Sequence, residues 1–506
     1  MSHRILVAVM SVACCGSYSS GQGLSPATPA KEYIRLNGQV IAIELVPTCS
    51  YGISPAGQGF SLSTGSSTIT VSSNCPWTAT SNASWISIVS GASGTGNGTV
   101  TYSVAANAGA QARSGTLTVA GRTFTVTQAG NPGSGPVALR YVPITPCRLV
   151  DTRLANGPFG GPVLTGGVSR DFVVSNGSCG VPSTAQAFSL NFAVVPRASF
   201  AHLTAWPAGE PQTLTSTLSS DGRVKGNAAI VGAGTGGAIS VMPSDDTHLV
   251  IDVTGYFQPS TGNTFFPVTP CRVADTRNAS GPLGGPYLAG NSTRAFPILS
   301  SACGVPSNAV AYSLNITALP RVPLQNLTAW ATGQTQPPTA TLNAPTGTST
   351  SNAGIVSAGV SGQVSIFVTN DTDLVIDING YFAPPGTGAL SLYMLQEPCR
   401  VLDSRNPPGS PALNGTLTIA LTGGACGLPA SARAYVLGAT AVPTGGLGYL
   451  TLWPNGQAQP LYATLVANDG ATTSNMAITA TINGSINAFA SNPTYLVLDA
   501  FGYFGP

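Results

Sequence analysis

A set of aspartates and arginines that recurs three times offers the clearest potential for chemistry in this 506-residue sequence. In its first copy, Asp151 and Arg153 stand two residues apart and Asp252 follows much later. Paired carboxylates could serve as glycosidase acid and base or as calcium ligands. A hydrogen-bonded Asp–Arg clamp between the first and last strands of a unit is the favoured interpretation, because a nearby guanidinium keeps a carboxylate ionised and so opposes acid catalysis. The matching residues of the later copies are Asp275, Arg277 and Asp377, then Asp403, Arg405 and Asp499.

A tryptophan in each copy could bind a sugar ring by stacking. Along a strand, alternation puts Leu203 and Ala205 on one face and Trp206 on the other. If the leucine face lies in the core, the indole stands outside. The interpretation we favour is an indole covered by a loop or by the neighbouring copy, since large aromatic side chains are mostly buried. The matching residues are Trp330 and Trp453, and three such platforms would add avidity.

Composition argues against other chemistry. The histidines are His3, His202 and His248, and the later copies carry Asn326 and Asp373 at positions that match the last two. The copies therefore cannot share a Ser–His–Asp or Cys–His device. Lysine occurs twice and the net charge is +2, so no basic face could neutralise a run of phosphates. We expect no enzymatic activity, cofactor, metal or nucleic-acid partner.

Eight of the ten cysteines fall into sequential pairs once Cys14 and Cys15 are set aside. An even, pairwise pattern in an exported chain indicates disulfides. Zinc would require clustered cysteines or nearby histidines, which the sequence lacks. The predicted pairs are Cys49 with Cys75, Cys147 with Cys179, Cys271 with Cys303, and Cys399 with Cys426.

An internal repeat organises most of the chain. Each copy opens with Pro-Cys-Arg and Asp-[Thr/Ser]-Arg, continues to Cys-Gly-[Val/Leu]-Pro and closes on Gly-Tyr-Phe. Units of this length are whole domains rather than solenoid turns. Short runs rich in Val, Ile and Thr between Gly, Pro and Asn clusters predict all-β sandwiches or jelly rolls. The predicted repeats comprise residues 139–258, 263–384 and 389–506, after a linker at 130–138. They resemble domains found in tandem, or beside cell-wall-acting enzymes, in exported bacterial proteins.

Residues 47–129 predict a separate, smaller β-domain. Its stretches 75–86, 98–107, 113–121 and 124–128 resemble the BACON family. The resemblance implies an immunoglobulin-like sandwich and an extracellular setting. It also brings the carbohydrate-binding role proposed for that family.

The first 22 residues have the features of a secretory signal, with basic residues ahead of the apolar run 5–13. Ordinary signal cleavage is the favoured interpretation, and a lipoprotein-type cleavage that leaves a lipidated Cys14 is the alternative. Residues 31–46 predict a hairpin similar to those of YD-repeat wall proteins. No other stretch has enough consecutive apolar residues to span a bilayer, so we expect a secreted or surface protein.

These patterns together predict a binding or adhesion protein that recognises carbohydrate or cell-wall material. A spacer without a ligand is the first alternative, and a polysaccharide hydrolase is the second. Exposed repeat tryptophans beside a groove would favour binding, whereas buried ones would favour the spacer. The third copy is the most divergent, so we expect it to be the one that has lost binding if any has.

Overall fold

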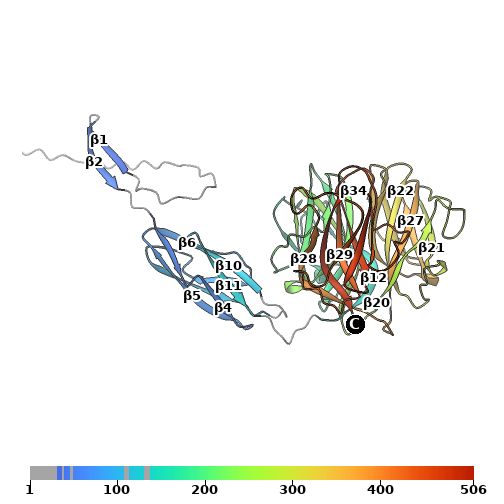
Figure 1. Ribbon diagram of the computed structural model, residues 1–506, viewed down its shortest axis with the longest axis horizontal. Helices are drawn as coiled ribbons and strands as arrows, with labels where there is room; N and C mark the ends of the chain where they lie inside the picture. Colours follow the sequence, from blue (N-terminus) through green and yellow to red (C-terminus); the bar gives the residue numbers. More distant parts are fainter. Residues whose placement is uncertain (1–30, 37–38, 46–48, 108–112, 130–136) are drawn as a thin grey trace, which may run out of the picture.

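The computed structural model describes residues 31–36, 39–45, 49–107, 113–129 and 137–506, which are mainly β-strands (Figure 1). They form a hairpin, a small sandwich that we call the N-terminal sandwich (49–129), and a head made of the three repeats. The predicted signal segment and Cys14 lie outside the described residues. The described residues include no helix with the length and apolarity to cross a membrane. The hairpin pairs β1 (Lys31–Leu36) with β2 (Gln39–Leu45).

The N-terminal sandwich consists of two facing sheets, with strand orders β3-β5-β9-β7 and β4-β11-β10-β6-β8. Apolar residues alternate along its strands, as Val100, Tyr102 and Val104 do, so each strand turns one face into a single core. Trp77 and Trp85 lie in that core. The strands are β3 (Tyr51–Ser54), β4 (Gly57–Phe60), β5 (Gly65–Ser73), β6 (Pro76–Ser81), β7 (Ile86–Ser90), β8 (Ser93–Thr95), β9 (Gly98–Val104), β10 (Arg113–Val119) and β11 (Arg122–Gln128).

Each repeat is a jelly roll of two four-stranded antiparallel layers. A bridge between Leu139 and Leu392 also joins one layer of repeat 1 to repeat 3. In one sheet the first strand pairs with the last, followed by the third and sixth; the other sheet holds the second, seventh, fourth and fifth. Repeat 1 contains β12 (Leu139–Asp151), β13 (Arg170–Val173), η1 (Val174–Asn176), β14 (Ala187–Pro196), β15 (His202–Pro207), β16 (Leu218–Ser219), β17 (Lys225–Gly232), η2 (Thr235–Gly237), β18 (Ala238–Pro243) and β19 (Thr247–Pro259). Repeat 2 contains β20 (Thr264–Asp275), β21 (Ser292–Pro297), η3 (Ile298–Ser300), β22 (Ala311–Pro320), β23 (Leu324–Ala331), β24 (Leu342–Ala344), β25 (Thr350–Ser357), η4 (Val360–Gly362), β26 (Gln363–Val368) and β27 (Thr372–Ala383).

Repeat 3 has the same plan, but one long strand takes the place of two. The first part of β34 pairs with β29 and β31, and its later part pairs with β28 and β30. The strands are β28 (Ser391–Asp403), β29 (Leu413–Ala420), β30 (Ala434–Pro443), β31 (Leu447–Pro454), β32 (Leu465–Ala467), β33 (Thr473–Ala480) and β34 (Ser485–Gly505).

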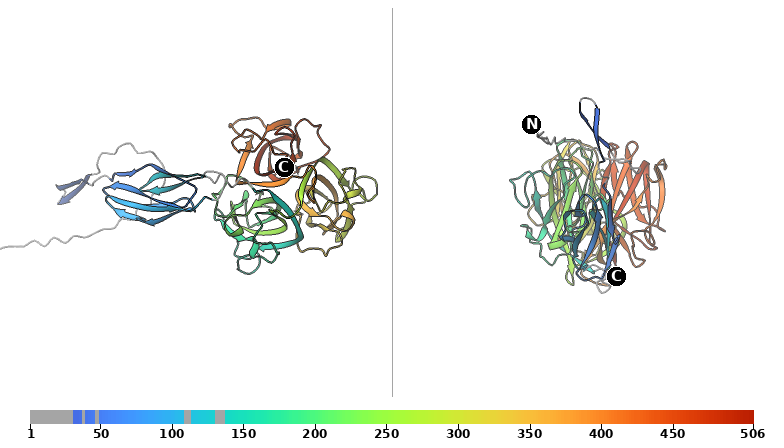
Figure 2. Two further views of the ribbon diagram at one scale, coloured as in Figure 1. Left: turned by 90° about the horizontal axis from the view of Figure 1, so that it is seen from below. Right: turned by 90° about the vertical axis from the view of Figure 1, so that its left-hand side faces the viewer.

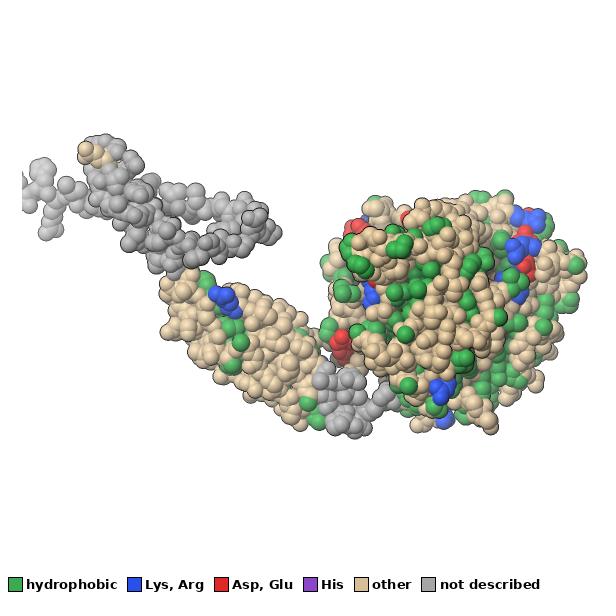
Figure 3. All heavy atoms as spheres, in the orientation of Figure 1, with side chains coloured by type: hydrophobic (Ala, Val, Ile, Leu, Met, Phe, Trp, Pro, Cys, Tyr) green, Lys and Arg blue, Asp and Glu red, His purple; other side chains and the backbone are tan. Residues whose placement is uncertain are grey.

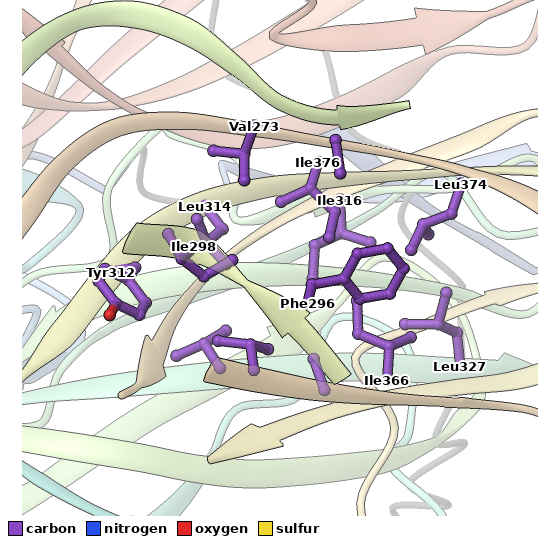
Figure 4. Packing of buried hydrophobic residues seen from close by; sticks show 14 of the residues in the cluster. Val273, Phe296, Ile298, Tyr312, Leu314, Ile316, Leu327, Ile366, Leu374 and Ile376 are labelled. Atoms are coloured by element: carbon purple, nitrogen blue, oxygen red, sulfur yellow. The ribbon is translucent and has the colours of Figure 1, made fainter. Parts of the chain in front are cut away.

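Every repeat has a core of its own between its two sheets. In repeat 2, Phe296 lies among Ile316, Ile366, Ile376 and Leu327 (Figure 4). All four predicted disulfides are present, and each repeat and the N-terminal sandwich holds one. They are Cys49–Cys75, Cys147–Cys179, Cys271–Cys303 and Cys399–Cys426.

The repeats also share a second core, which the sequence had not indicated. They are arranged around a common axis (Figure 2), and a separate cluster of buried residues draws on all three of them. Phe257, Phe382 and Phe504, the last residues of the three Gly-Tyr-Phe signatures, belong to this cluster. The rings of Phe382 and Phe504 lie 6.1 Å apart, as do those of Phe257 and Phe382. The head is therefore one closed body.

The glycine of this signature allows a close approach between first and last strands. A Cβ on Gly255 would lie 2.3 Å from the hydroxyl of Tyr141, and one on Gly380 would lie 2.2 Å from the ring of Phe265. These two aromatic rings cross the closing strand on their way into the shared core. Only glycine leaves the space for them.

Candidate functional site

The Asp-[Thr/Ser]-Arg segments are local ion pairs that also fix the closing strand. Asp151 accepts hydrogen bonds from the backbone, Nε and Nη2 of Arg153, the latter two at 2.8 and 2.6 Å. These bonds hold the pKa of Asp151 below its usual value. The Thr152 hydroxyl accepts from the backbone N–H of Leu249. Ser404 makes the equivalent bond to Leu496, which explains why serine replaces threonine in repeat 3.

A different arginine forms the strand-to-strand clamp. Arg272 donates from Nε to Asp377 at 2.6 Å and from Nη1 to Asp275 at 3.3 Å, so it joins β20 to β27. The predicted clamp therefore exists, but Arg153 and its counterparts are not the residues that bridge the two aspartates. Arg148, Arg272 and Arg400 do so. The sequence could have identified these three arginines, because each directly follows the first cysteine of its repeat.

The clamped aspartates also reach the next repeat. Asp377 accepts from the backbone of Ala463, and burial raises its pKa to about 6 in spite of Arg272. Asp252 and Asp499 likewise accept from Ala340 and Ser216, so the three contacts close a ring from repeat to repeat. Each of these carboxylates thus accepts from an arginine of its own repeat and from a backbone N–H of the next. The described residues hold no group of three or more His, Cys, Asp or Glu side chains suited to a metal ion.

The repeat tryptophans are buried, which is the arrangement expected of a covered indole and not of a stacking platform. Trp206, Trp330 and Trp453 are 5%, 5% and 3% exposed. The indole does lie on the face of the strand opposite to the leucine, as the alternation predicts. The loop after the strand folds back over that outer face and covers the indole. In repeat 1 the indole Nε1 donates to the carbonyl of Glu210 at 3.0 Å, and the Thr204 hydroxyl donates to the carbonyl of Thr215.

A groove of about 610 Å³ lies between repeats 2 and 3, and we call it the 2/3 groove. Residues from the clamp of repeat 2 form one side, and residues around β31 and the loop after it form the other. A volume of this order is typical of ligand sites. The lining residues used below are Arg272, Arg277, Tyr449, Gln459 and Leu461.

The groove combines apolar surface with hydrogen-bond donors. Leu461 is 81% exposed and Tyr449 is 38% exposed, so an apolar side chain and an aromatic ring face solvent together. The Arg277 side chain is half exposed, while its partner Asp275 is buried behind it. Burial by itself would raise the pKa of Asp275. The hydrogen bonds from Arg277 outweigh this effect, so the pKa of Asp275 lies below its usual value. The guanidinium therefore meets solvent as part of an ion pair.

The other two boundaries between repeats lack the tyrosine. Tyr449 is matched by Asn326 and His202, whereas Leu461 is matched by Pro338 in one loop and by an exposed leucine, Leu214, in the other. Sequence reasoning missed Tyr449 because it searched for features that all three copies share. Although the third copy is the most divergent in sequence, the third repeat supplies the aromatic side of this groove.

Comparison with known proteins identifies one segment. Residues 76–129 match the BACON family model, described as "Putative binding domain, N-terminal". A solved structure of a Bacteroides ovatus GH5 xyloglucanase in complex with a XXXG heptasaccharide is 20% identical over 17% of this chain and 19% of that chain, with a TM-score of 0.16. The chain therefore spans less than a fifth of that structure. The curated proteins contain no match.

The N-terminal sandwich thus has a BACON-type sequence and a β-sandwich fold, as predicted from the resemblance. Its two tryptophans are structural. The Trp77 Nε1 donates to the carbonyl of Gly96 at 2.8 Å, and the Arg113 guanidinium covers the ring of Trp85 at 4.3 Å. Neither ring is free to stack on a sugar.

Proposed function

We propose that this chain is a non-catalytic, secreted or surface-exposed binding protein that recognises carbohydrate through the 2/3 groove of its head. The observation that carries the proposal is the exposed Tyr449 beside Leu461 and Arg277 in a hollow of ligand size. The BACON match to residues 76–129 and the four disulfides support an extracellular binding role.

The lining chemistry suits a sugar chain. An aromatic face packs on the C–H face of a pyranose ring, and polar groups at its edge bind the hydroxyls. Gln459 is exposed, and the described residues offer no hydrogen-bond partner to Nη1 of Arg277. Both side chains can donate to hydroxyl oxygens.

The alternative of a stalk has less support. Buried tryptophans were its predicted sign, and they are buried. A stalk, however, becomes longer by the addition of domains in line. These three repeats close around a shared core (Figure 2), so together they make the molecule wider and not longer. Catalysis has less support still, because the candidate aspartates are paired with arginines and backbone amides.

Binding to a panel of neutral and acidic polysaccharides and peptidoglycan, measured by titration calorimetry, tests the proposal. Tyr449→Ala should weaken binding about tenfold or more, as expected for an aromatic anchor. Tyr287→Ala is the matched control, because Tyr287 is 37% exposed and lies outside the groove. Binding that survives Tyr449→Ala unchanged would place the site elsewhere. Absence of binding across the panel would favour the stalk.

A further inference from the structure

The head has three boundaries between repeats, which we call seams 1/2, 2/3 and 3/1. In each, the loop that covers a tryptophan approaches the first strand of the preceding repeat. At seam 1/2 the Thr145 hydroxyl donates to Oε1 of Gln334 at 3.1 Å, beside a hollow of about 660 Å³. Seam 2/3 places Thr269 and Gln457 around a similar hollow of about 600 Å³, distinct from the 2/3 groove. Both seams are uncharged at these positions.

Seam 3/1 is acidic at the same two positions. Glu397 stands where the other first strands have threonine, and Glu210 stands where the other loops have glutamine. Burial raises the pKa of Glu210, and repulsion from Glu397 adds to that effect. Two carboxylates so placed are unfavourable unless a cation joins them.

The N-terminal sandwich lies at this seam. The Ser84 hydroxyl donates to the carbonyl of Gly209 at 2.8 Å, next to Glu210. Arg113 offsets part of the raised pKa of Glu210 through their attraction. Arg113 is held for this role by hydrogen bonds to the Ala105 carbonyl at 2.7 Å and to Gln128 at 3.0 Å.

Charge makes the pairing selective. Residues 49–129 contain no aspartate, glutamate, lysine or histidine, so Arg113 and Arg122 give the N-terminal sandwich a charge of +2 and no acidic side chain appears on it in Figure 3. Seams 1/2 and 2/3 offer the same loop with glutamine in place of Glu210, and therefore have no charge for Arg113 to meet. Complementary charges across an interface contribute more to the choice between surfaces than to the strength of binding.

We infer that seam 3/1 is the docking surface for the chain's own N-terminal sandwich, and that Glu210 and Glu397 select it over the two seams that have glutamine and threonine at those positions. The docking fixes the sandwich beside repeat 1 and leaves seams 1/2 and 2/3 open. The 2/3 groove then stays accessible in every copy of the chain.

Crosslinking of the full chain tests this, with Cys14 and Cys15 replaced by serine. Gln212, Gln336 and Gln459 are exposed residues at equivalent places on the three loops, and Gln212 is three residues beyond Gly209. A short bismaleimide should join Ser84→Cys to Gln212→Cys. It should join Ser84→Cys to Gln336→Cys or Gln459→Cys far less.

Glu210→Gln with Glu397→Thr gives seam 3/1 the residues of the other seams. We expect this variant to lower the yield of the Ser84–Gln212 crosslink several-fold. High salt should lower the yield by a similar factor when Glu210 and Glu397 are left unchanged. Because the salt experiment needs no substitution at the seam, it holds even if the variant folds poorly. Equal crosslinking at all three loops, or a Gln212 yield indifferent to both salt and the double substitution, would overturn the inference.

Discussion

The N-terminal sandwich and a repeat of the head are both disulfide-linked β-sandwiches, but they bury their surfaces differently. The N-terminal sandwich closes around one cluster, which its own strands supply completely. A repeat has an internal core and also contributes to the cluster on the axis. A tandem sequence can therefore encode either independent modules or parts of one body. The difference depends on whether a strand is apolar on one face or on both.

Removing a ring from the shared core should have the largest effect. Phe382→Ala should lower the free energy of unfolding by about 3–5 kcal/mol, because a fully buried ring leaves a cavity. All three repeats should be destabilised together, since they share that core. Differential scanning calorimetry should show the transition of the whole head move.

Phe124→Ala is the counterpart in the N-terminal sandwich. Phe124 is fully buried and packs against Tyr102 at 5.4 Å, so a similar loss should appear in the sandwich transition alone. If Phe382→Ala moves a transition that accounts for only one third of the unfolding enthalpy of the head, the repeats unfold separately and the shared core does not make them cooperative.

Hydrogen bonds between repeats should rank second. The Asn352 side chain accepts from the backbone of Ala228 in repeat 1 and donates to Asn191 in repeat 1 and to Thr341 in its own repeat. Asn352→Ala leaves buried groups without partners and should cost about 1–3 kcal/mol in urea unfolding. Asn475 and Asn227 make the matching contacts to Ala353 and Met476.

Asn82 provides the comparison on the N-terminal sandwich, where its amide joins two threonines at an exposed site. Asn82→Ala should change stability by less than about 0.5 kcal/mol. An equally small effect for Asn352→Ala would mean that the ring of asparagines does not hold the repeats together.

The dependence of stability on pH should be the smallest difference. The pKa of Asp377 is raised from 3.8 to about 6 in the folded head. The protonated form is therefore favoured by folding, and this contribution is full below pH 3.8 and lost as pH rises through 6. The head should lose about 2 kcal/mol or less between pH 4 and 6.5.

Over the same range the N-terminal sandwich should show a flat profile, since residues 49–129 lack acids and histidine. Asp377→Asn should be less stable because Arg272 loses one of its two carboxylate partners. Its stability measured by chemical denaturation should also depend less on pH. A slope that persists unchanged in Asp377→Asn would assign the effect to other groups.

Sequence predicted the fold class and the pairing of cysteines because those depend on local patterns. Runs of alternating apolar residues and sequentially paired cysteines have few other interpretations. The shared core was harder to foresee, because a period identifies units without saying how they pack. One sign was present in strands such as Ala434-Tyr435-Val436-Leu437, whose residues alternate between the shared core and the core of the repeat.

The candidate site was predicted only in part, for the same reason. Alternation placed Trp206 on the correct face, but it could not show that residues after the strand return to cover the indole. Asp151 and Arg153 do pair, but β12 ends at Asp151 and Arg153 lies in the turn that follows, so they do not share a strand face. Arg148 reaches the closing strand through a bulged register, which spacing along one strand does not encode.

The cyclic contacts between Asp252, Asp377, Asp499 and the loops of the next repeat give the head the geometry of a homotrimer within a single polypeptide. In a true homotrimer one gene specifies all three interfaces, so any substitution appears in each of them. Fusion removes that constraint. One interface could acquire Tyr449, another could acquire Glu210 and Glu397, and the aromatic axis could stay as it was.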